Sequence, residues 1–361
     1  MASILLKEKI PKFAFFARSL KENEVPIFVS HYVIKDEFRS NLEYLKNNGY
    51  YTLSTDEFYG FIKFNNEIPK RSVLLTFDDG HLNNWDVVFP LLKEFNMKAT
   101  IFVTPGTMTD KLEGHLDLDN TWPSFSCFSW QEAKIMQDTG LVDIQSHTLA
   151  HQVCFINSKI VDFQRPLHNG EPKYRWLWTA VEAGNNDELW GAPVYEYRSR
   201  MTALRYFDGI HLRKSCMDFV SSNGGVRFFD NLEWRWILNR FVNEFRIQNR
   251  VQDNYETKEE QVHQIKYSLA KSREVIKEKL NKDCFYLALP WNQGNSLTLK
   301  LIEESGYRAN FSGTSSFVTA KYGSNPYLLN RVEGYWIKSL PGKGRVSVFN
   351  KLGSRLCKSA N

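Results

Sequence analysis

A strand with no alternation of polar and apolar residues constrains the fold of this chain most strongly. Residues 72–77 read SVLLTF, a pattern typical of a parallel strand that is covered on both faces. A helical pattern at 83–95, where Pro90 implies a kink or an early turn, and a second apolar strand at 98–106 follow it. Because parallel strands need a crossover connection, usually a helix, this order predicts a β-α-β unit.

The same alternation recurs along most of the 361 residues. Further strands are expected at 25–33, 141–147 and 284–291, and further helices at 36–50, 129–140, 258–280 and 296–307. Between 152 and 257 the pattern is lost in a stretch rich in Trp, Tyr, Arg and Asn, which we interpret as a large folded insertion. In parallel α/β folds the functional groups gather at the carboxyl ends of the strands.

The composition limits the partners and the location of the protein. The net charge of +5 comes from scattered Lys and Arg residues, so we expect no nucleic-acid partner. Five cysteines at wide spacing, with no C-x-x-C pair, fit the reduced thiols of a cytoplasmic protein. Residues 1–20 lack the uncharged core of a signal peptide, and no apolar stretch approaches the ~20 residues that span a bilayer. We expect a cytoplasmic protein without a transmembrane segment, with peripheral attachment to the inner face of the membrane as an alternative.

Two adjacent carboxylates, Asp78 and Asp79, follow the strand at 72–77 and precede Gly80. Like charges repel, so two carboxylates at the end of a buried strand need a compensating cation. One interpretation is an ordinary surface turn, since Asp and Gly are common in turns. The other is a metal site in which the second carboxylate stays available for proton transfer.

A pair of histidines provides further candidate ligands. His147 and His151 stand four residues apart in the sequence SHTLAH, where the strand expected at 141–147 ends. Two imidazoles and one carboxylate form a common zinc set of three ligands with an open position. Histidines at this spacing are often incidental, but the Asp-Asp-Gly turn at another strand end favours a shared metal site.

Several segments resemble one enzyme family. The sequences TFDDG (76–80), SHTLAH (146–151) and FYLALPWNQGN (285–295) resemble the NodB-homology family of polysaccharide deacetylases. VPIFVSHYV (25–33) resembles the opening segment of its poly-N-acetylglucosamine deacetylase subgroup.

The resemblance implies an α/β fold, namely a distorted (β/α) barrel of about seven strands with a large insertion. The deacetylase barrel would span 25–340 and would be interrupted by the insertion at 152–257. An N-terminal extension (1–24) and a C-terminal tail (341–361) would flank it.

The resemblance also implies the roles of four side chains. Asp79, His147 and His151 would hold one divalent metal ion, Zn²⁺ in the first place, with Co²⁺ or Ni²⁺ as alternatives. Asp78 would be the general base that takes a proton from the attacking water. The metal would then neutralise one of the two adjacent carboxylates and leave the other available.

The remaining candidate residues follow from the same resemblance. Pro290 and Trp291 match a family segment that donates a backbone N–H to the substrate oxygen, and Asn292 adjoins them. Trp291 could also stack on a sugar ring, with a buried core aromatic as the alternative. Arg331 resembles a late arginine of the subgroup that would orient the base at the substrate site. Many members carry their general acid, a histidine, near the C-terminal end, and no histidine follows His263 here. The subgroup resembles a circularly permuted form with this histidine on the first strand, so the resemblance makes His31, in FVSHYV, the general acid, with an ordinary core histidine as the alternative.

The activity that the resemblance implies is metal-dependent hydrolytic N-deacetylation of an N-acetylated amino sugar in a glycan or a glycan precursor. The partner would be a carbohydrate containing N-acetylhexosamine, either free or lipid-linked. Two alternatives stay open: an O-deacetylase, which is a carbohydrate esterase, and a catalytically inactive glycan-binding barrel. The chain has no Walker loop, G-x-G-x-x-G or G-x-S-x-G motif, so neither a nucleotide cofactor nor a serine nucleophile is expected.

Overall fold

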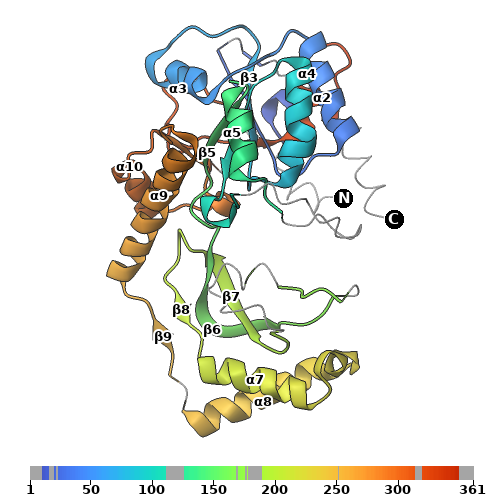
Figure 1. Cartoon of the computed structure of the whole chain (residues 1–361), viewed down its shortest axis with the longest axis vertical. Coiled ribbons are helices and arrows are strands. Elements are labelled where there is room, and N and C mark those ends of the chain that lie inside the picture. The colour runs from blue at the N-terminus through green and yellow to red at the C-terminus, as the bar shows by residue number, and fades with distance from the viewer. Residues whose placement is uncertain are drawn as a thin grey trace. The chain divides into compact units, whose positions relative to one another are not determined.

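The computed structural model describes most of the chain, which divides into two compact units (Figure 1). The described residues are 10–15, 20–21, 23–110, 126–167, 170–174, 177, 189–250, 252–313 and 319–348. The first unit comprises Met1–Ala150, Ser268–Gly294 and Leu299–Asn361, and the second comprises His151–Tyr267 and Asn295–Thr298.

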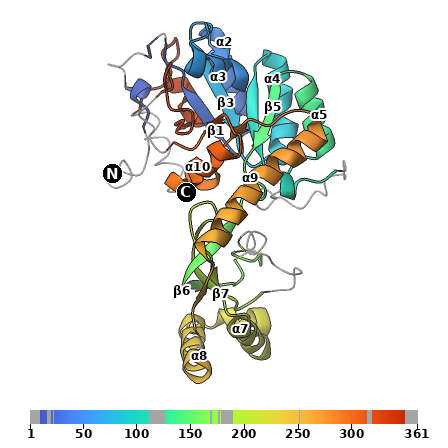
Figure 2. The same ribbon diagram turned by 90° about the vertical axis from the view of Figure 1, so that its left-hand side faces the viewer.

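The first unit is built on a curled parallel sheet of eight strands (Figure 2). Seven of them follow the order β11-β10-β5-β4-β3-β1-β12, β2 pairs with β3, and each of these pairings is parallel. The strands are β1 (Ile27–Ser30), β2 (Tyr51–Thr52), β3 (Ser72–Phe77), β4 (Ala99–Val103), β5 (Val142–Ser146), β10 (Tyr286–Leu287), β11 (Ala309–Asn310) and β12 (Val332–Glu333). An isolated parallel bridge between Gly313 and Asn330 links the two ends of this order. The predicted distorted (β/α) barrel of about seven strands is therefore confirmed.

Helices connect these strands, as the sequence pattern predicts. The helical segments are η1 (Lys12–Ala14), α2 (Lys35–Asn47), α3 (Thr55–Phe64), η2 (Asn84–Val88), α4 (Phe89–Phe95), η3 (Pro105–Thr107), α5 (Trp130–Asp138), α9 (Lys258–Leu280), η5 (Pro290–Asn292), α10 (Ser296–Glu304) and η6 (Gly334–Ser339). Both α3 and α5 begin with a capping box, in which a serine and a glutamate satisfy each other's backbone N–H groups.

The core of the first unit lies inside the sheet and under α3. Phe58 of α3 and Phe102 of β4 both pack on Phe311, with ring centroids 5.8 and 5.3 Å away from it. All three side chains are fully buried. Large aromatic side chains contribute much of the burial energy of a core, so these contacts fix α3 to the sheet.

The second unit has two small sheets of its own and its own core. Its elements are the antiparallel pair β6 (Val153–Phe163) and β7 (Pro193–Ser199), the pair β8 (Tyr206–Phe207) and β9 (Asn254–Tyr255), and the helices α7 (Ile210–Ser222), η4 (Gly225–Asp230) and α8 (Trp234–Asn249). Phe163 of β6 shares one apolar cluster with Val220 of α7 and Leu238 of α8. Several aromatic residues of this region, among them Phe163, Trp190 and Phe228, are therefore core residues of a folded unit.

The structure corrects several predicted elements. The helix predicted at 83–95 is a π-helix (η2) that runs directly into α4, and Pro90 lies in the first turn of α4. The strand predicted at 284–291 is reduced to Tyr286–Leu287. Helix α3 was missed because a capping box with only ten residues gives a weak periodic signal. None of the described helices has both the length and the apolar character needed to cross a membrane.

Candidate active site

The predicted site residues lie around the carboxyl ends of the parallel strands. His31 follows β1, Asp78 and Asp79 follow β3, and His147 follows β5. Pro290, Trp291 and Asn292 form the short helix η5, which comes after β10. Arg331 directly precedes β12, and its long side chain reaches Asp78. The structure thus brings together residues that are up to 300 positions apart in the sequence.

Asp78 is a buried carboxylate held in its ionised form. Its residue surface is 2% exposed, and both of its oxygens accept hydrogen bonds from the Arg331 guanidinium, at 2.6 and 2.7 Å. Burial by itself would raise the pKa of Asp78, but the adjacent positive charge of Arg331 and its hydrogen bonds outweigh burial and lower this pKa well below its ordinary value. Asp78 therefore stays a proton acceptor over the whole neutral range.

The Arg331 guanidinium is held from a second side. Its Nη2 donates to Asn292 Oδ1 at 3.2 Å as well as to Asp78 Oδ2. The Arg331 side chain is 2% exposed, and its guanidinium lies 5.8 Å from the ring centroid of Phe102. The fixed planar fork of arginine suits this bidentate grip on a carboxylate. Arg331 therefore contacts both the predicted base Asp78 and Asn292.

Asp79, His147 and His151 form a group with metal-ligand geometry. One potential ligand atom from each of the three lies within 4.8 Å of the other two. Asp79 Oδ1 is 3.3 Å from His147 Nε2. Asp79 and His151 both adopt left-handed backbone conformations, with φ of 71° and 50°, and Gly80 continues the turn with φ of 72°. This backbone sends Asp78 and Asp79 in different directions from one strand end.

The tautomer of His147 tests whether this group suits a cation. Its Nδ1 lies 2.8 Å from the carbonyl oxygen of Ala288, which can only accept a hydrogen bond, so Nδ1 carries the proton. In the neutral ring, Nε2 then presents a lone pair to the Asp79 carboxylate at 3.3 Å. Two such acceptors repel each other unless a proton or a metal ion lies between them. Two imidazoles and a carboxylate form a common catalytic zinc set, and the carbonyl contact is the usual outer support of such a ligand, so the residues fit a divalent metal ion.

Two further histidines lie near these groups. His31 Nε2 is 3.9 Å from Asp78 Oδ2, and its side chain is 52% exposed. An exposed imidazole beside the predicted base can reach a bound substrate. His81 Nε2 is 3.8 Å from Asp79 Oδ2, and burial lowers the pKa of His81, although the nearby Asp79 charge opposes this shift. His81 directly follows the Asp-Asp-Gly turn, and its contact with Asp79 places it next to the ligand group.

Trp291 is an exposed aromatic residue at this edge of the barrel. It is 50% exposed, so the alternative of a buried core aromatic is wrong. Its backbone adopts a left-handed conformation, with φ of 60°, between the buried Pro290 and Asn292. A bulky residue rarely adopts this backbone conformation, and residues that do so are common at functional sites.

The backbone partner of His147, Ala288, has no counterpart in the sequence analysis. A carbonyl oxygen carries no residue-type signal, so its role emerges only from the parallel pairing of β10 with β5.

The carbonyl of Asp79 accepts contacts from Thr104 Oγ1 at 3.5 Å and Cys127 Sγ at 3.6 Å. These two residues support the turn that carries the candidate ligand.

Comparison with known protein families now adds to this geometry. Residues 65–168 match the family model described as polysaccharide deacetylase. This segment belongs to the polysaccharide deacetylase family. It contains both Asp78 and Asp79 and both His147 and His151, and so it includes every residue of the candidate metal group and the predicted base.

Two curated relatives of the deacetylase segment are similar over part of their length. The chain is 28% identical over 157 residues to YxkH of Bacillus subtilis (strain 168), which is named as a candidate polysaccharide deacetylase. It is 29% identical over 136 residues to a poly-β-1,6-N-acetyl-D-glucosamine N-deacetylase of Staphylococcus aureus. The matches include 41% and 38% of this chain and 51% and 42% of the relatives. The chain therefore spans about half the length of the curated relatives it matches.

Solved structures support the fold. A de-N-acetylase from Aggregatibacter actinomycetemcomitans is similar with a TM-score of 0.54 at 15% identity, over 86% of this chain and 95% of the other. The BpsB deacetylase domain from Bordetella bronchiseptica is similar with a TM-score of 0.51 at 16% identity, over 87% of this chain and 97% of the other. At this level of identity the likeness concerns the barrel fold alone.

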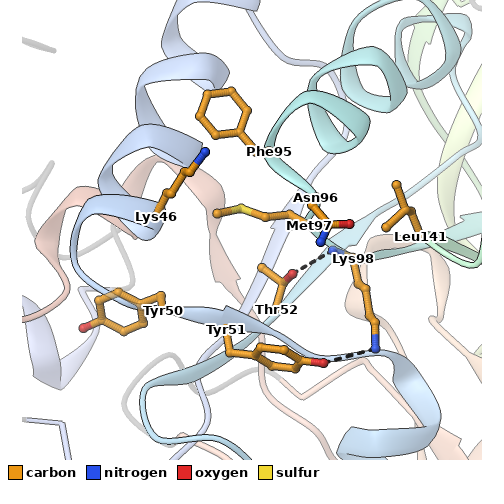
Figure 3. A pocket seen from close by; sticks show the side chains of 9 residues that line it. All are labelled: Lys46, Tyr50, Tyr51, Thr52, Phe95, Asn96, Met97, Lys98 and Leu141. Atoms are coloured by element: carbon orange, nitrogen blue, oxygen red, sulfur yellow. Dashed lines mark hydrogen bonds between the residues drawn. The ribbon is translucent and has the colours of Figure 1, made fainter.

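A cavity of ≈ 230 Å³ lies at the other end of the strands and contains none of the predicted site residues (Figure 3). Its lining comes from the ends of α2 and α4 and from the starts of β2, β4 and β5. Lys98 Nζ donates there to Tyr51 Oη at 3.3 Å and to Glu57 Oε2 at 3.0 Å. At the amino ends of barrel strands such contacts usually serve stability, so this cavity is not a candidate active site.

Proposed function

We propose that this protein is a metal-dependent hydrolase that removes the acetyl group from an N-acetylated amino sugar of a glycan. The match of residues 65–168 to the polysaccharide deacetylase family supports the reaction class. The observation that carries the proposal is the buried, arginine-bound Asp78 next to the Asp79, His147 and His151 group. Such a pair of sites gives hydrolysis a base and a cation at adjacent positions of one turn.

Asp79, His147 and His151 would hold the metal ion. When bound, a divalent ion supplies Lewis-acid chemistry, because it polarises a carbonyl oxygen and lowers the pKa of water toward neutrality. The remaining chemistry belongs to side chains of the chain. Asp78 accepts the proton of the attacking water, since its lowered pKa keeps the carboxylate ionised.

His31 would act as the general acid. As the new C–O bond forms and the C–N bond of the acetamide breaks, His31 Nε2–H donates a proton to the departing amine nitrogen. The products are acetate and a free amino sugar, and one water is consumed. The 3.9 Å between His31 Nε2 and Asp78 Oδ2 allows both groups to reach one acetamide from neighbouring positions.

The segment Pro290–Asn292 would bind the substrate. The backbone N–H of Trp291 would stabilise the developing charge on the acetyl oxygen, and its exposed ring would stack on a sugar. Arg331 is better assigned to holding Asp78, because Asp78 and Asn292 occupy its fork. The name of the Staphylococcus aureus relative makes β-1,6-linked N-acetylglucosamine the first substrate to try.

The free thiols of the described cysteines support a reducing compartment. Cys127, Cys154, Cys216 and Cys284 are all free in the structure. We therefore keep the cytoplasm as the proposed location, where precursors such as lipid-linked saccharides would be available as substrates.

The proposal is tested by acetate release. Purified protein loaded with Zn²⁺, Co²⁺ or Ni²⁺ is incubated with N-acetylglucosamine oligomers, free and lipid-linked, and with O-acetylated sugars. We expect acetate and new amines from the N-acetyl substrates, and Asp78→Asn should lower this rate by ~10²–10⁴-fold with the metal content unchanged. The surface variant Asp138→Asn is the matched control and should keep full activity. Release from O-acetyl sugars alone would point to an esterase, and no release from any substrate would favour an inactive binding barrel.

A further inference from the structure

We propose that Asn83 is a positioning residue that holds His31 in place for proton donation, an inference that rests on the proposed function. Asn83 is 9% exposed and stands at the start of η2, three positions after Gly80. Its side-chain Oδ1 accepts from the N–H of Val33 at 2.9 Å, and its Nδ2 donates to the carbonyl of Val33 at 3.2 Å. One buried amide therefore satisfies both backbone groups of one residue, two positions after His31.

The chemistry of the two groups fixes how the amide is oriented. A backbone N–H can only donate and a carbonyl can only accept, so Oδ1 must face the N–H and Nδ2 must face the carbonyl. These two hydrogen bonds restrain both peptide units around Val33. A side chain with one polar atom could not impose the same restraint.

A second backbone contact holds the other side of His31. The N–H of Asp78 donates to the carbonyl of Ser30 at 3.0 Å. His31 therefore lies between two anchored residues, Ser30 and Val33. Both anchors come from the segment 78–83, which also carries the proposed base and the proposed ligand Asp79. The same segment of backbone therefore carries the proposed base and anchors the proposed acid.

Side-chain packing contributes little to the position of this loop. The His31 side chain is 52% exposed, and Tyr32 and Ile34 are 55% and 57% exposed. Three exposed side chains in four residues leave the backbone anchors as the main restraint on His31. A shift of about 1 Å in a catalytic group can lower a rate ~10²-fold, so the amide of Asn83 matters for turnover.

A double-mutant cycle tests the role. We measure kcat and KM for acetate release from a β-1,6-linked N-acetylglucosamine oligomer with wild type, Asn83→Ala, His31→Ala and the double variant, each with measured metal content. Asn83→Ala should lower kcat about 10–100-fold with KM and metal content nearly unchanged. In the His31→Ala background the same change should cost less than about threefold, because no acid is left to position.

Asn48→Ala is the matched control. Its side chain also binds the N–H and the carbonyl of one residue, Lys343, at 2.7 and 3.3 Å, and Asn48 has no contact with the proposed site. Any loss that it causes should be the same with His31 or Ala at position 31. Asn83→Asp keeps the acceptor for the Val33 N–H, and it replaces Asn83→Ala in the cycle if the latter does not fold.

Two results would overturn the inference in different ways. If the Asn83 variant loses the same factor of kcat in both backgrounds, Asn83 supports the fold and does not position His31. If wild type releases no acetate from the oligomer, the proposed function fails first and the inference fails with it. An active wild type with a purely additive cycle therefore refutes the role of Asn83 and leaves the proposed function intact.

Discussion

Replacing Arg331 by methionine removes the cation that holds the buried Asp78 carboxylate. Methionine keeps most of the length and apolar contact of the arginine stem, so the lost feature is the guanidinium. Both partners are 2–3% exposed at their side chains, and two hydrogen bonds of 2.6 and 2.7 Å join them. The variant leaves a buried negative charge with its main partner removed.

The structure sets the expected magnitude. Removing one partner of a buried ion pair usually lowers the free energy of unfolding by about 3–5 kcal/mol. Asp78→Asn in the same chain removes the stranded charge, so the double variant should recover about 1–3 kcal/mol relative to Arg331→Met alone. In deacetylation the single variant should also lose activity, because its base is no longer held in one orientation.

The dependence on pH has a definite sign. The pKa of Asp78 in the folded protein is lower than in the unfolded chain, so the Arg331–Asp78 pair stabilises the fold fully above a pH of about 4. That stabilisation is lost as the pH falls through the lower folded pKa. In Arg331→Met the pKa of Asp78 rises, because burial is no longer opposed by the arginine. The gap in stability between wild type and variant should therefore narrow as the pH falls below the raised pKa of Asp78 in the variant.

Equilibrium urea unfolding at pH 7 and at pH 3.5, followed by circular dichroism, measures both effects. Arg39→Met is the matched control, since Arg39 grips Glu94 with the same bidentate geometry at the surface. An exposed pair contributes about 0–1 kcal/mol, so this variant should stay near wild type. A loss below about 1 kcal/mol in Arg331→Met, or no recovery in the double variant, would refute the reasoning.

Two further predictions concern exposed and buried side chains. Burial raises the pKa of Cys154 to about 11 and those of Cys216 and Cys284 to about 12. Alkylation at pH 8 should therefore modify these three thiols only after the protein is unfolded in urea. Labelling of these cysteines in the native protein, detected by mass spectrometry, would contradict their burial. Trp291→Ala should raise KM for a sugar oligomer about fivefold, which corresponds to the roughly 1 kcal/mol of one stacking contact. Trp236 of α8 is also exposed, at 61% against 50% for Trp291, and Trp236→Ala should leave KM unchanged. An unchanged KM in Trp291→Ala would remove the stacking role.

The sequence predicts the barrel well where its signals are local. The run at 72–77 has every residue buried in β3, as a strand covered on both faces requires. The short strands β10, β11 and β12 have two residues each, which is too short for any periodic pattern. Their positions depend on pairing with distant strands, so the sequence gives only an apolar segment near β10 and no sign of β12.

The sequence likewise predicts some features of the candidate site and not others. Asp78 and Asp79 stand out by residue type and position, and His147 and His151 by spacing. The grip of Arg331 on Asp78 joins residues 253 positions apart, and no spacing rule predicts such a contact. The regular elements at 152–257 were also missed, because a small two-layer unit needs only short apolar patches, such as Leu212, Cys216 and Val220 on α7. Tertiary packing decides these features.

Metal content tests the central claim most directly. Wild type, Asp79→Asn, His147→Gln and His151→Gln are purified in parallel, dialysed against a weak chelator and analysed for transition metals, with folding checked by circular dichroism. The account predicts about one equivalent of Zn²⁺, Co²⁺ or Ni²⁺ in wild type and a loss of at least ~10-fold in affinity in each folded variant. A wild-type protein that binds no divalent ion, or three variants that keep it unchanged, would contradict the proposed metal site.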